Sequence, residues 1–298
     1  MIALQFINEG YTKSKVLSVC KVPKSSFYYK ALAVELHSQK GAIKSTITYK
    51  HDNTFISNTI VVKWIKKLLS HEFVDYGYLK VTHYLRSEKH LCINPKKVYR
   101  MMKENNLLNP VSYKIKGQKT WVKELVPNAT EAFVYWEFDI KFVYIHQLGR
   151  YAPMLSIIDV YSRYLIGWIM QWSIKKEDVK YFFEAILEDY SMPLNVCVRC
   201  DNGSQFESYL VREYLASKNI LQEFTRPATP EQNAHIESYH SIITRAVCNR
   251  FEFQNIEHAT ATMIRWEKFY NRHRIHSGIN YMSPEKYLQS QNILIPKK

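Results

Sequence analysis

The spacing of apolar side chains predicts that the first part of the chain is helical. Residues 1–30 predict a short helix, a turn near Pro23, and a second helix that Ser25 caps. Residues 40–59 are polar and lack a regular apolar pattern, which indicates a linker. Over residues 61–69 the apolar positions return at helical spacing, so a further helix is expected there.

The segment 71–108 predicts two helices joined by a turn. The first begins within 81–85, and in the second Asn94 is the expected cap, with Pro95 at the first helical position. One side of this second helix is apolar, and its other sides carry the cations Lys96, Lys97, Arg100 and Lys103. A helix-turn-helix that places a basic helix on DNA has this pattern. A solvated amphipathic helix has it too, so the segment alone leaves both interpretations open.

From residue 132 the pattern changes to short runs of aromatic and β-branched residues, which indicate strands. The expected strands are 133–146, 151–160, 164–172, 195–200 and 221–225. Helices are expected over 173–190 and 204–218, from Pro230, and after Ile256. This order predicts an α/β fold in which three antiparallel strands and two further strands form a mixed sheet flanked by helices.

The distribution of charged residues along the chain indicates a binding partner. The 298 residues carry a formal net charge of +14, and 46% are hydrophobic, as in an ordinary globular protein. Residues 1–128 hold 22 Lys or Arg against 8 Asp or Glu, whereas residues 129–298 hold 19 of each. A basic excess confined to one part favours contact with a polyanion such as DNA, although surplus lysine can also serve solubility. Three cations of the segment 109–128 are placed to follow a DNA backbone: Lys114, Lys116 and Lys119.

The sequence gives no sign of a membrane or secreted protein. No stretch approaches the roughly 20 apolar residues of a membrane span, and the first ten residues lack a secretory signal pattern. Five cysteines, an odd number, indicate reduced thiols. Cys197 and Cys200 form a Cys-x-x-Cys pair, but such positions point to opposite faces of a strand, so buried thiols are favoured over a zinc site. We therefore expect a cytoplasmic protein without membrane contact.

Three carboxylates carry the candidate chemistry. Asp139 lies in the middle of the first long strand, Asp201 ends the fourth strand, and Glu237 lies on the helix that starts at Pro230. Asn233 shares a face of that helix with Glu237. Carboxylates brought together repel one another and call for a cation, and oxygen ligands favour Mg²⁺ or Mn²⁺. The alternative is that all three are ordinary surface acids. A fourth acid, Asp159, lies near them in sequence, and for it a structural hydrogen-bonding role is favoured over metal binding.

The flanking motifs and the gap of 35 residues between Asp201 and Glu237 form a recognisable set. The motifs are Tyr76-Gly77-Tyr78, Lys97 to Glu104, Trp136 to Ile140, Ile158 to Arg163, Asp201 to Phe206, Asn233 to Ser238, and Tyr270 to Pro284. With them, residues 60–290 resemble the orfB-type insertion-sequence transposases, whose core is similar to that of retroviral integrases. The resemblance implies an RNase H-like catalytic core over 129–250. It also implies an N-terminal helical segment and linker over 1–59, a basic helix-turn-helix-like region and linker over 60–128, and a C-terminal helical extension over 251–298.

The resemblance further implies what the chain acts on. Asp139, Asp201 and Glu237 would be the catalytic residues and the ligands of two Mg²⁺ or Mn²⁺ ions that cleave DNA and transfer the 3′-OH end. The expected partners are terminal inverted repeats and target DNA, further copies of the chain on DNA, and an upstream-frame protein or frameshift fusion. The localisation implied is bacterial, associated with the nucleoid. Asn233, Arg272 and Arg274 are candidate DNA contacts. A metal-dependent nuclease and a catalytically silent DNA-binding regulator remain alternatives.

Overall fold

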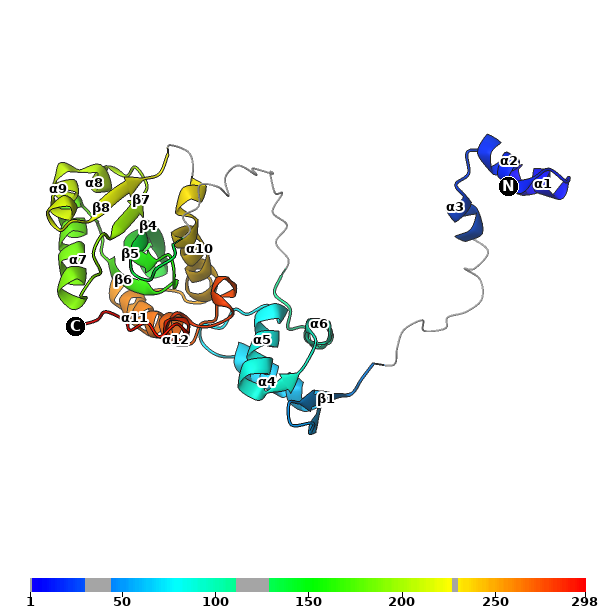
Figure 1. Ribbon diagram of the computed structural model, residues 1–298, viewed down its shortest axis with the longest axis horizontal. Coiled ribbons are helices and arrows are strands. Elements are labelled where there is room, and N and C mark those ends of the chain that lie inside the picture. Colours follow the sequence, from blue (N-terminus) through cyan, green and yellow to red (C-terminus); the bar gives the residue numbers. More distant parts are fainter. Residues whose placement is uncertain (1, 30–43, 111–128, 227–229) are drawn as a thin grey trace. The chain divides into compact units, whose positions relative to one another are not determined.

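The first of two compact units contains three short helices (Figure 1). The computed structural model describes residues 2–29, 44–110, 129–226 and 230–298, and the units are Met1–Thr46 and Ile47–Lys298. In the first unit the helices are α1 (Ile2–Asn8), α2 (Lys13–Val19) and α3 (Lys24–Tyr29). Two helices replace the single one expected before the turn, because Gly10 has a φ of +97° between them. Ser25 lies inside α3, so the prediction that it caps the helix is wrong.

A small antiparallel sheet begins the second unit, where a linker was expected over 40–59. Strand β1 (Ile47–Lys50) pairs with β2 (Phe55–Ser57) on one side and with β3 (Leu91–Cys92) on the other. The turn between β1 and β2 is closed by Asp52 Oδ1, which accepts from Thr54 N at 2.9 Å and from Thr54 Oγ1 at 2.6 Å. These strands are too short to produce a period that a sequence pattern can detect.

Three helices pack beside this sheet. They are α4 (Asn58–Leu69), α5 (Tyr78–Lys89) and α6 (Pro95–Glu104). The cap predicted for α6 is confirmed, since Asn94 Oδ1 accepts from Lys96 N at 2.8 Å and Pro95 occupies the first helical position. Val98 and Met102 on α6 are fully buried in a core shared with α4 and α5. Lys96 and Lys103 are exposed on α6.

The main sheet has five strands in the order β6-β5-β4-β7-β8. They are β4 (Tyr135–Ile145), β5 (Arg150–Asp159), β6 (Leu165–Met170), β7 (Cys197–Cys200) and β8 (Leu221–Phe224). Strands β4, β5 and β6 are antiparallel neighbours, while β7 runs parallel to β4 and β8 parallel to β7. The predicted mixed sheet of three antiparallel and two further strands is therefore confirmed.

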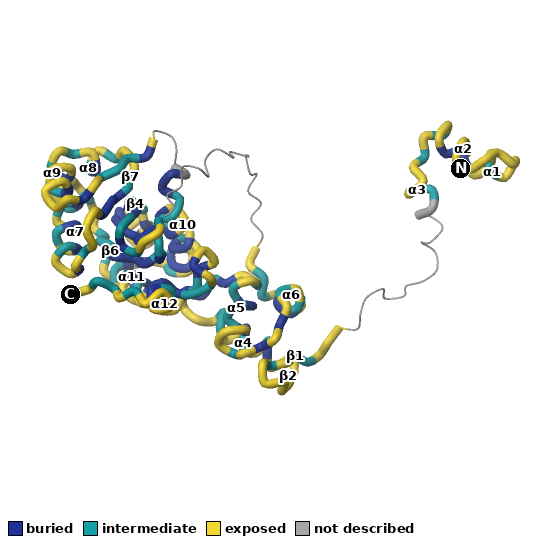
Figure 2. The backbone as a smooth tube through the Cα atoms, viewed as in Figure 1, coloured by how far each residue is buried: buried dark blue, intermediate teal, exposed yellow. Residues whose placement is uncertain are grey.

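Helices cover both faces of this sheet (Figure 1). On one face lie α7 (Lys176–Asp189), α8 (Ser204–Glu207) and α9 (Tyr209–Ser217), and on the other α10 (Ala234–Ile243) and α11 (Ile256–Arg272). The remaining helical segments are α12 (Pro284–Ser290), the π-helix Thr244–Cys248, and the 3-10 turns His146–Leu148, Pro230–Asn233 and Ser277–Ile279. The single helix expected over 204–218 is divided by Ser208, whose hydroxyl caps α9. Burial is concentrated in the sheet and the helices packed on it (Figure 2).

The turn after β5 is held by one buried carboxylate. Asp159 is fully buried, and its Oδ1 accepts from Phe133 N at 2.9 Å. Its Oδ2 accepts from Ser162 N at 2.8 Å and from Ser162 Oγ at 2.5 Å. Burial raises the pKa of this carboxyl, and the hydrogen bonds oppose that rise. Asp159 therefore has the structural hydrogen-bonding role expected for it.

None of the helices that the structure describes has the length and apolar character needed to span a bilayer.

Replacing Asp159 by Ala is expected to lower the free energy of unfolding by about 2–4 kcal/mol, because two buried backbone N–H groups would lose their acceptor. Urea titration followed by tryptophan fluorescence measures the loss. Asp189→Ala, at the exposed end of α7, is the matched control and should shift the free energy by less than about 0.5 kcal/mol. Equal effects of the two substitutions would contradict the role given to Asp159.

Candidate active site

Two of the three candidate carboxylates come from neighbouring parallel strands, one within its strand and one directly after it. Asp139 is in β4, and the β4–β7 register pairs Glu137 with Arg199. Continued by two residues, that register places Asp201, just after β7, level with Asp139. Neighbouring strands are about 4.8 Å apart, so the two carboxylates come from adjacent backbone positions.

The loop that carries Asp201 is fixed by its own polar groups. Asn202 Nδ2 donates to Thr225 O at 2.8 Å and ties the loop to the end of β8. Asp201 Oδ1 accepts from Gly203 N at 3.0 Å. A Cβ on residue 203 would lie 2.7 Å from Gln205 Nε2 and 3.1 Å from Asp201 Oδ1, so a larger residue here would have to displace the end of the Gln205 side chain. Asp201 itself is exposed at the end of the strand.

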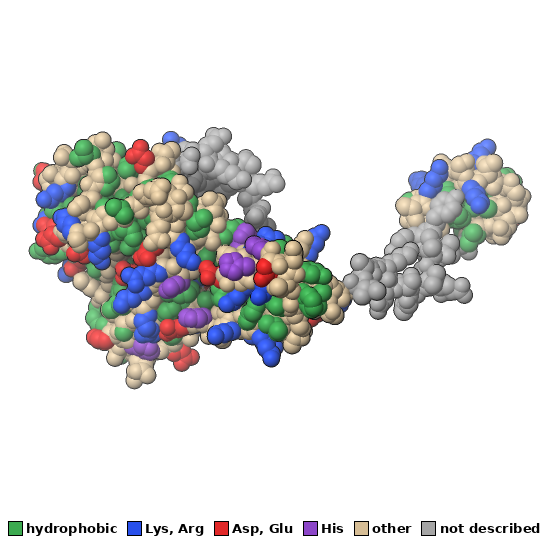
Figure 3. Space-filling view, turned by 60° about the horizontal axis from the view of Figure 1, so that its bottom comes forward, with side chains coloured by type: hydrophobic (Ala, Val, Ile, Leu, Met, Phe, Trp, Pro, Cys, Tyr) green, Lys and Arg blue, Asp and Glu red, His purple; other side chains and the backbone are tan. Residues whose placement is uncertain are grey.

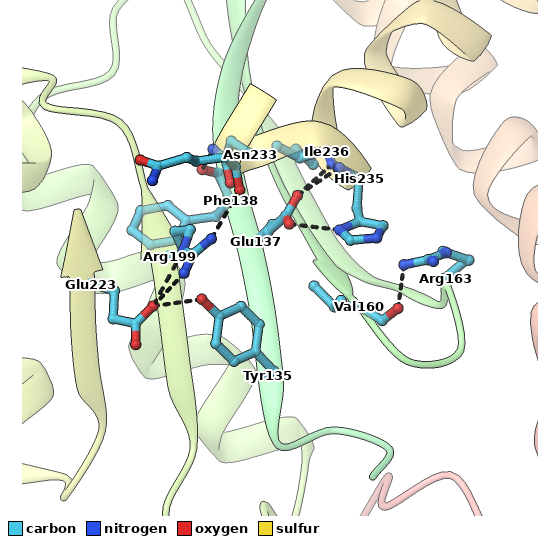
Figure 4. Close-up of polar contacts among 11 residues, drawn as sticks. Tyr135, Glu137, Phe138, Val160, Arg163, Arg199, Glu223, Asn233, His235 and Ile236 are labelled. Carbon is cyan, nitrogen blue, oxygen red and sulfur yellow. Dashed lines mark hydrogen bonds and ion pairs between the residues drawn. The ribbon is translucent and has the colours of Figure 1, made fainter. Parts of the chain in front are cut away.

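Glu237 reaches the same region because α10 is anchored on β4 by a buried acid, Glu137 (Figure 4). Glu137 is fully buried, and its Oε2 accepts from His235 N at 2.9 Å and from Ile236 N at 2.8 Å. Its Oε1 lies 2.7 Å from His235 Nδ1. The carboxylate thus satisfies N–H groups in the first turn of α10, where the helix dipole favours a negative charge. Glu237, in the same helical turn, is exposed.

A second connection joins the segment before α10 to the sheet (Figure 4). Arg199 on β7 pairs with Glu223 on β8 at 2.9 Å, and its Nη1 donates to Gln232 O at 3.1 Å. Asn233 is buried, and its Nδ2 donates to Phe138 O at 3.4 Å. The sheet and the start of α10 are thereby connected through residues of both β4 and β7.

The three carboxylates share one electrostatic environment. Burial raises the pKa of the Asp139 carboxyl to about 7, and the charges of Asp201 and Glu237 add to that rise. The N–H of Ile140, which donates to Asp139 Oδ1 at 2.7 Å, opposes it. Near neutral pH, Asp139 is therefore divided between its protonated and ionised forms.

His240, one turn after Glu237, contacts this acid. Its Nδ1 lies 3.5 Å from Asp139 Oδ2. Burial lowers the pKa of His240 to about 3, and the charge of Lys141 lowers it further. The imidazole is consequently neutral at physiological pH, so this contact is not an ion pair and Asp139 gains no compensating positive charge from it.

The donor set fits a divalent cation. Carboxylate oxygens whose mutual repulsion raises a pKa are hard ligands suited to Mg²⁺ or Mn²⁺. Among the described residues, no three His, Cys, Asp or Glu side chains already stand in a metal-binding group. Asp201 and Glu237 are exposed, so they can turn toward Asp139 without repacking the core.

The predicted DNA contacts are placed very differently by the structure. Arg272 is exposed and pairs with Glu285 at 3.4 Å, whereas Arg274 is only 1% exposed and pairs with Asp75 at 2.6 Å. Asn233 is 4% exposed. Both side chains therefore lie inside the protein and not on its open surface, and contact of either with DNA is still a prediction.

The basic residues of the helix-turn-helix-like region also differ from one another. Lys97 Nζ donates to Ile47 O and Arg100 is partly buried, which leaves Lys96 and Lys103 as the exposed cations of that set. The predicted contacts Lys114, Lys116 and Lys119 lie outside the described residues. Cys197 and Cys200 are buried free thiols, and burial raises the pKa of each to about 12, as expected for strand cysteines without a reactive role.

Sequence reasoning missed Glu137, and it placed His240 on the same helix face as Glu237 without giving it a role. A signal for Glu137 existed, because it lies two residues before Asp139 and side chains two apart share a strand face. His240 shares a helix face with Glu237, but no pattern showed that it would be buried against Asp139.

Comparison with known proteins shows which families and relatives the chain matches. Residues 129–230 match the family model described as integrase core domain, residues 218–284 match a second model of that description, and residues 58–114 match an HTH-like domain. The transposase for insertion sequence element IS904 of Lactococcus lactis is 26% identical over 243 residues, 78% of this chain and 94% of the relative. Transposase InsF for insertion sequence IS3A of Escherichia coli is 26% identical over 223 residues, 71% of this chain and 76% of the relative.

Among solved structures, the HTLV-2 integrase catalytic core domain in complex with magnesium matches 54% of this chain and 99% of that chain. Its sequence is 14% identical and the TM-score is 0.41. The family models place an HTH-like domain before an integrase core domain in this chain. The chain is an enzyme of the DNA transposase and integrase class, related over most of its length to insertion-sequence transposases.

Replacing Asp139 by Asn is expected to stabilise the metal-free protein, and more so at pH 8 than at pH 5. The pKa of this carboxyl is about 7 in the folded state and 3.8 in the unfolded chain, so the unfolded state releases its proton first. Stability from this group is therefore lost as pH rises from about 4 to about 7, by up to about 4 kcal/mol. We expect a gain of about 1–3 kcal/mol at pH 8.

Thermal unfolding without divalent cations, at both pH values, measures this difference. Asp189→Asn, an exposed acid on α7, is the control and should show no such trend. A gain for Asp139→Asn that is the same at pH 5 and pH 8 would mean that repulsion and burial do not strain this carboxyl.

Glu137→Ala is expected to lower the free energy of unfolding by about 3 kcal/mol, because the N-terminus of α10 would lose its buried acceptor. Glu137→Gln keeps an oxygen that can accept these bonds and should cost less. Hydrogen exchange at the first turn of α10 distinguishes local from global loosening. Unchanged protection there in the Ala variant would contradict the anchoring role.

Proposed function

We propose that this chain is a DDE transposase that binds the ends of an insertion sequence and cleaves and joins DNA strands. Asp139, Asp201 and Glu237 are its catalytic residues in this proposal. The observation that carries it is geometric: within an integrase core domain the β4–β7 register places Asp201 level with Asp139, and the charges of Asp201 and Glu237 both act on the buried Asp139 carboxyl. A shared field of this kind belongs to a functional site more often than to unrelated surface acids.

Divalent cations complete the proposed site. Oxygen atoms of Asp139, Asp201 and Glu237 would hold two Mg²⁺ or Mn²⁺ ions, which supply a lowered pKa for the attacking water and stabilisation of the leaving 3′ oxygen. Asp139 is held in place by β4, and Glu137 fixes the helix that carries Glu237. The neutral His240 beside Asp139 adds no positive charge that would compete with a cation.

DNA is the proposed substrate and partner. The HTH-like domain, with Lys96 and Lys103 exposed on α6, is suited to phosphate contact, and Arg272 is a further exposed cation of the second unit. The terminal inverted repeats and the target would be bound by several copies of the chain. An upstream-frame protein, or a fusion made by frameshifting, would add a further DNA-binding part. The protein would act in the bacterial cytoplasm, at the nucleoid.

The test is a cleavage and strand-transfer assay with a duplex that carries the element's terminal repeat and Mg²⁺ or Mn²⁺. Glu237→Gln is expected to slow nicking and joining by about 100-fold or more, the scale on which a preorganised charged group contributes to catalysis. Its retention of DNA should stay within about twofold, because the substitution leaves the basic surfaces intact. Glu252→Gln, an exposed acid outside the site, is the control and should keep full activity.

Three other results would each redirect the assignment. Cleavage without joining of labelled 3′ ends by the unaltered protein would indicate a nuclease. DNA retention without any cleavage would indicate a regulator. Full activity of Glu237→Gln would remove this residue from the catalytic set.

A further inference from the structure

A cavity of about 250 Å³ opens at the N-terminus of α5, away from the three carboxylates. It is lined by residues of the HTH-like region, including Asp75, Gly77 and Lys80, and by two arginines of the C-terminal part, Arg245 and Arg274. The motif Tyr76-Gly77-Tyr78 forms part of its surroundings and has no place in the proposed catalytic step. The proposed catalytic step therefore gives this cavity no role.

The start of α5 offers hydrogen-bond donors that no side chain caps. Gly77 is the N-cap residue, it has no side chain to accept a bond, and the first turn of the helix contains no acidic residue. A Cβ at Gly77 would meet nothing within 4 Å, so the space in front of this position is open. The positive end of a helix of 12 residues, left uncapped, favours an anion.

A buried guanidinium faces the same cavity. Arg274 is 1% exposed, and its Nη2 lies 2.6 Å from Asp75 Oδ1. Within the part of the chain that the structure describes, its Nε and Nη1 have no hydrogen-bond partner. The rings of Tyr76 and Trp266, at 5.7 and 5.6 Å from its central carbon, hold the group in position. Unsatisfied buried donors of a charged group are costly, and an anion would satisfy them.

Positive charge exceeds negative charge around the cavity. Arg245 shares Asp75 with Arg274, at 3.4 Å from Asp75 Oδ2, so one carboxylate serves two guanidinium groups. Lys80 is the third cation, and burial together with the charge of Arg274 lowers its pKa to about 7. Figure 3 shows that Lys and Arg side chains also gather on one face of the second unit. A bound anion would restore the charge of Lys80 and balance the arginines.

We propose that this cavity is a phosphate-binding site formed by the N-terminus of α5 with Lys80, Arg245 and Arg274, and that the phosphate belongs to a DNA backbone. The choice of DNA as the source rests on the proposed function, whereas the affinity for phosphate does not. The site would hold one strand between the HTH-like domain and the C-terminal arginines, and so set the register of the duplex on the enzyme.

The first experiment measures the effect of inorganic phosphate on thermal unfolding of the full chain at constant ionic strength. Phosphate is expected to raise the melting temperature of the unaltered protein and of Lys268→Gln, an exposed control on α11. The increase should be lost in Lys80→Gln and in Arg245→Gln. Absence of a response in the unaltered protein, or an equal response in all four proteins, would overturn the site.

The second experiment measures duplex affinity against salt concentration by fluorescence anisotropy. Each of the two cavity substitutions is expected to weaken binding by about 5–10-fold and to reduce the slope of log K against log salt by about 1, whatever the DNA sequence. A normal slope in variants that have lost the phosphate response would overturn DNA as the source and leave a site for free phosphate. Cleavage by the Glu237 site is assayed separately, so failure here would not imply failure of the catalytic proposal.

Discussion

The candidate site depends on the buried carboxylate of Glu137, which joins the central strand of the sheet to the first turn of α10. It accepts from two backbone N–H groups and contacts His235 Nδ1. Burying an acid without partners would be prohibitive, so the strand and the helix start each require the other. This contact fixes the start of the helix that carries Glu237 on the strand that carries Asp139, and the bonds from Arg199 and Asn233 support it.

The site also shows how stability and chemistry oppose each other. Nothing that the structure describes around Asp139 neutralises its charge, and its two acidic neighbours make ionisation harder. The rest of the core compensates: aromatic side chains pack on both sides of the sheet, with Phe138 against Phe183 and Phe206 on one side and Tyr239 against Tyr270 on the other. A rigid apolar frame lets the protein maintain strain at one polar edge.

The sequence allowed the main sheet and its helices to be predicted, because strands such as β4 and β5 are long enough to show their period and Asn94-Pro95 marks a helix start plainly. The β1–β2 hairpin escaped because strands of four and three residues show no period. For the site, the three acids could be picked out by spacing and resemblance, and their assignment as ligands is still a prediction. The burial of Arg274 and Asn233 could not be foreseen, since it arises from contacts with Asp75 and Phe138, which are distant in sequence.

Because successive side chains of β4 point to opposite faces of the sheet, the length of this strand is constrained in evolution. Phe138 faces one core while Glu137 and Asp139, on either side of it, face α10. Inserting or deleting a single residue in this strand would exchange the two sets, burying acids among aromatic rings and exposing phenylalanine at the polar edge. Changes of length should therefore be confined to the surface turns that join the strands, while β4 tolerates substitution only.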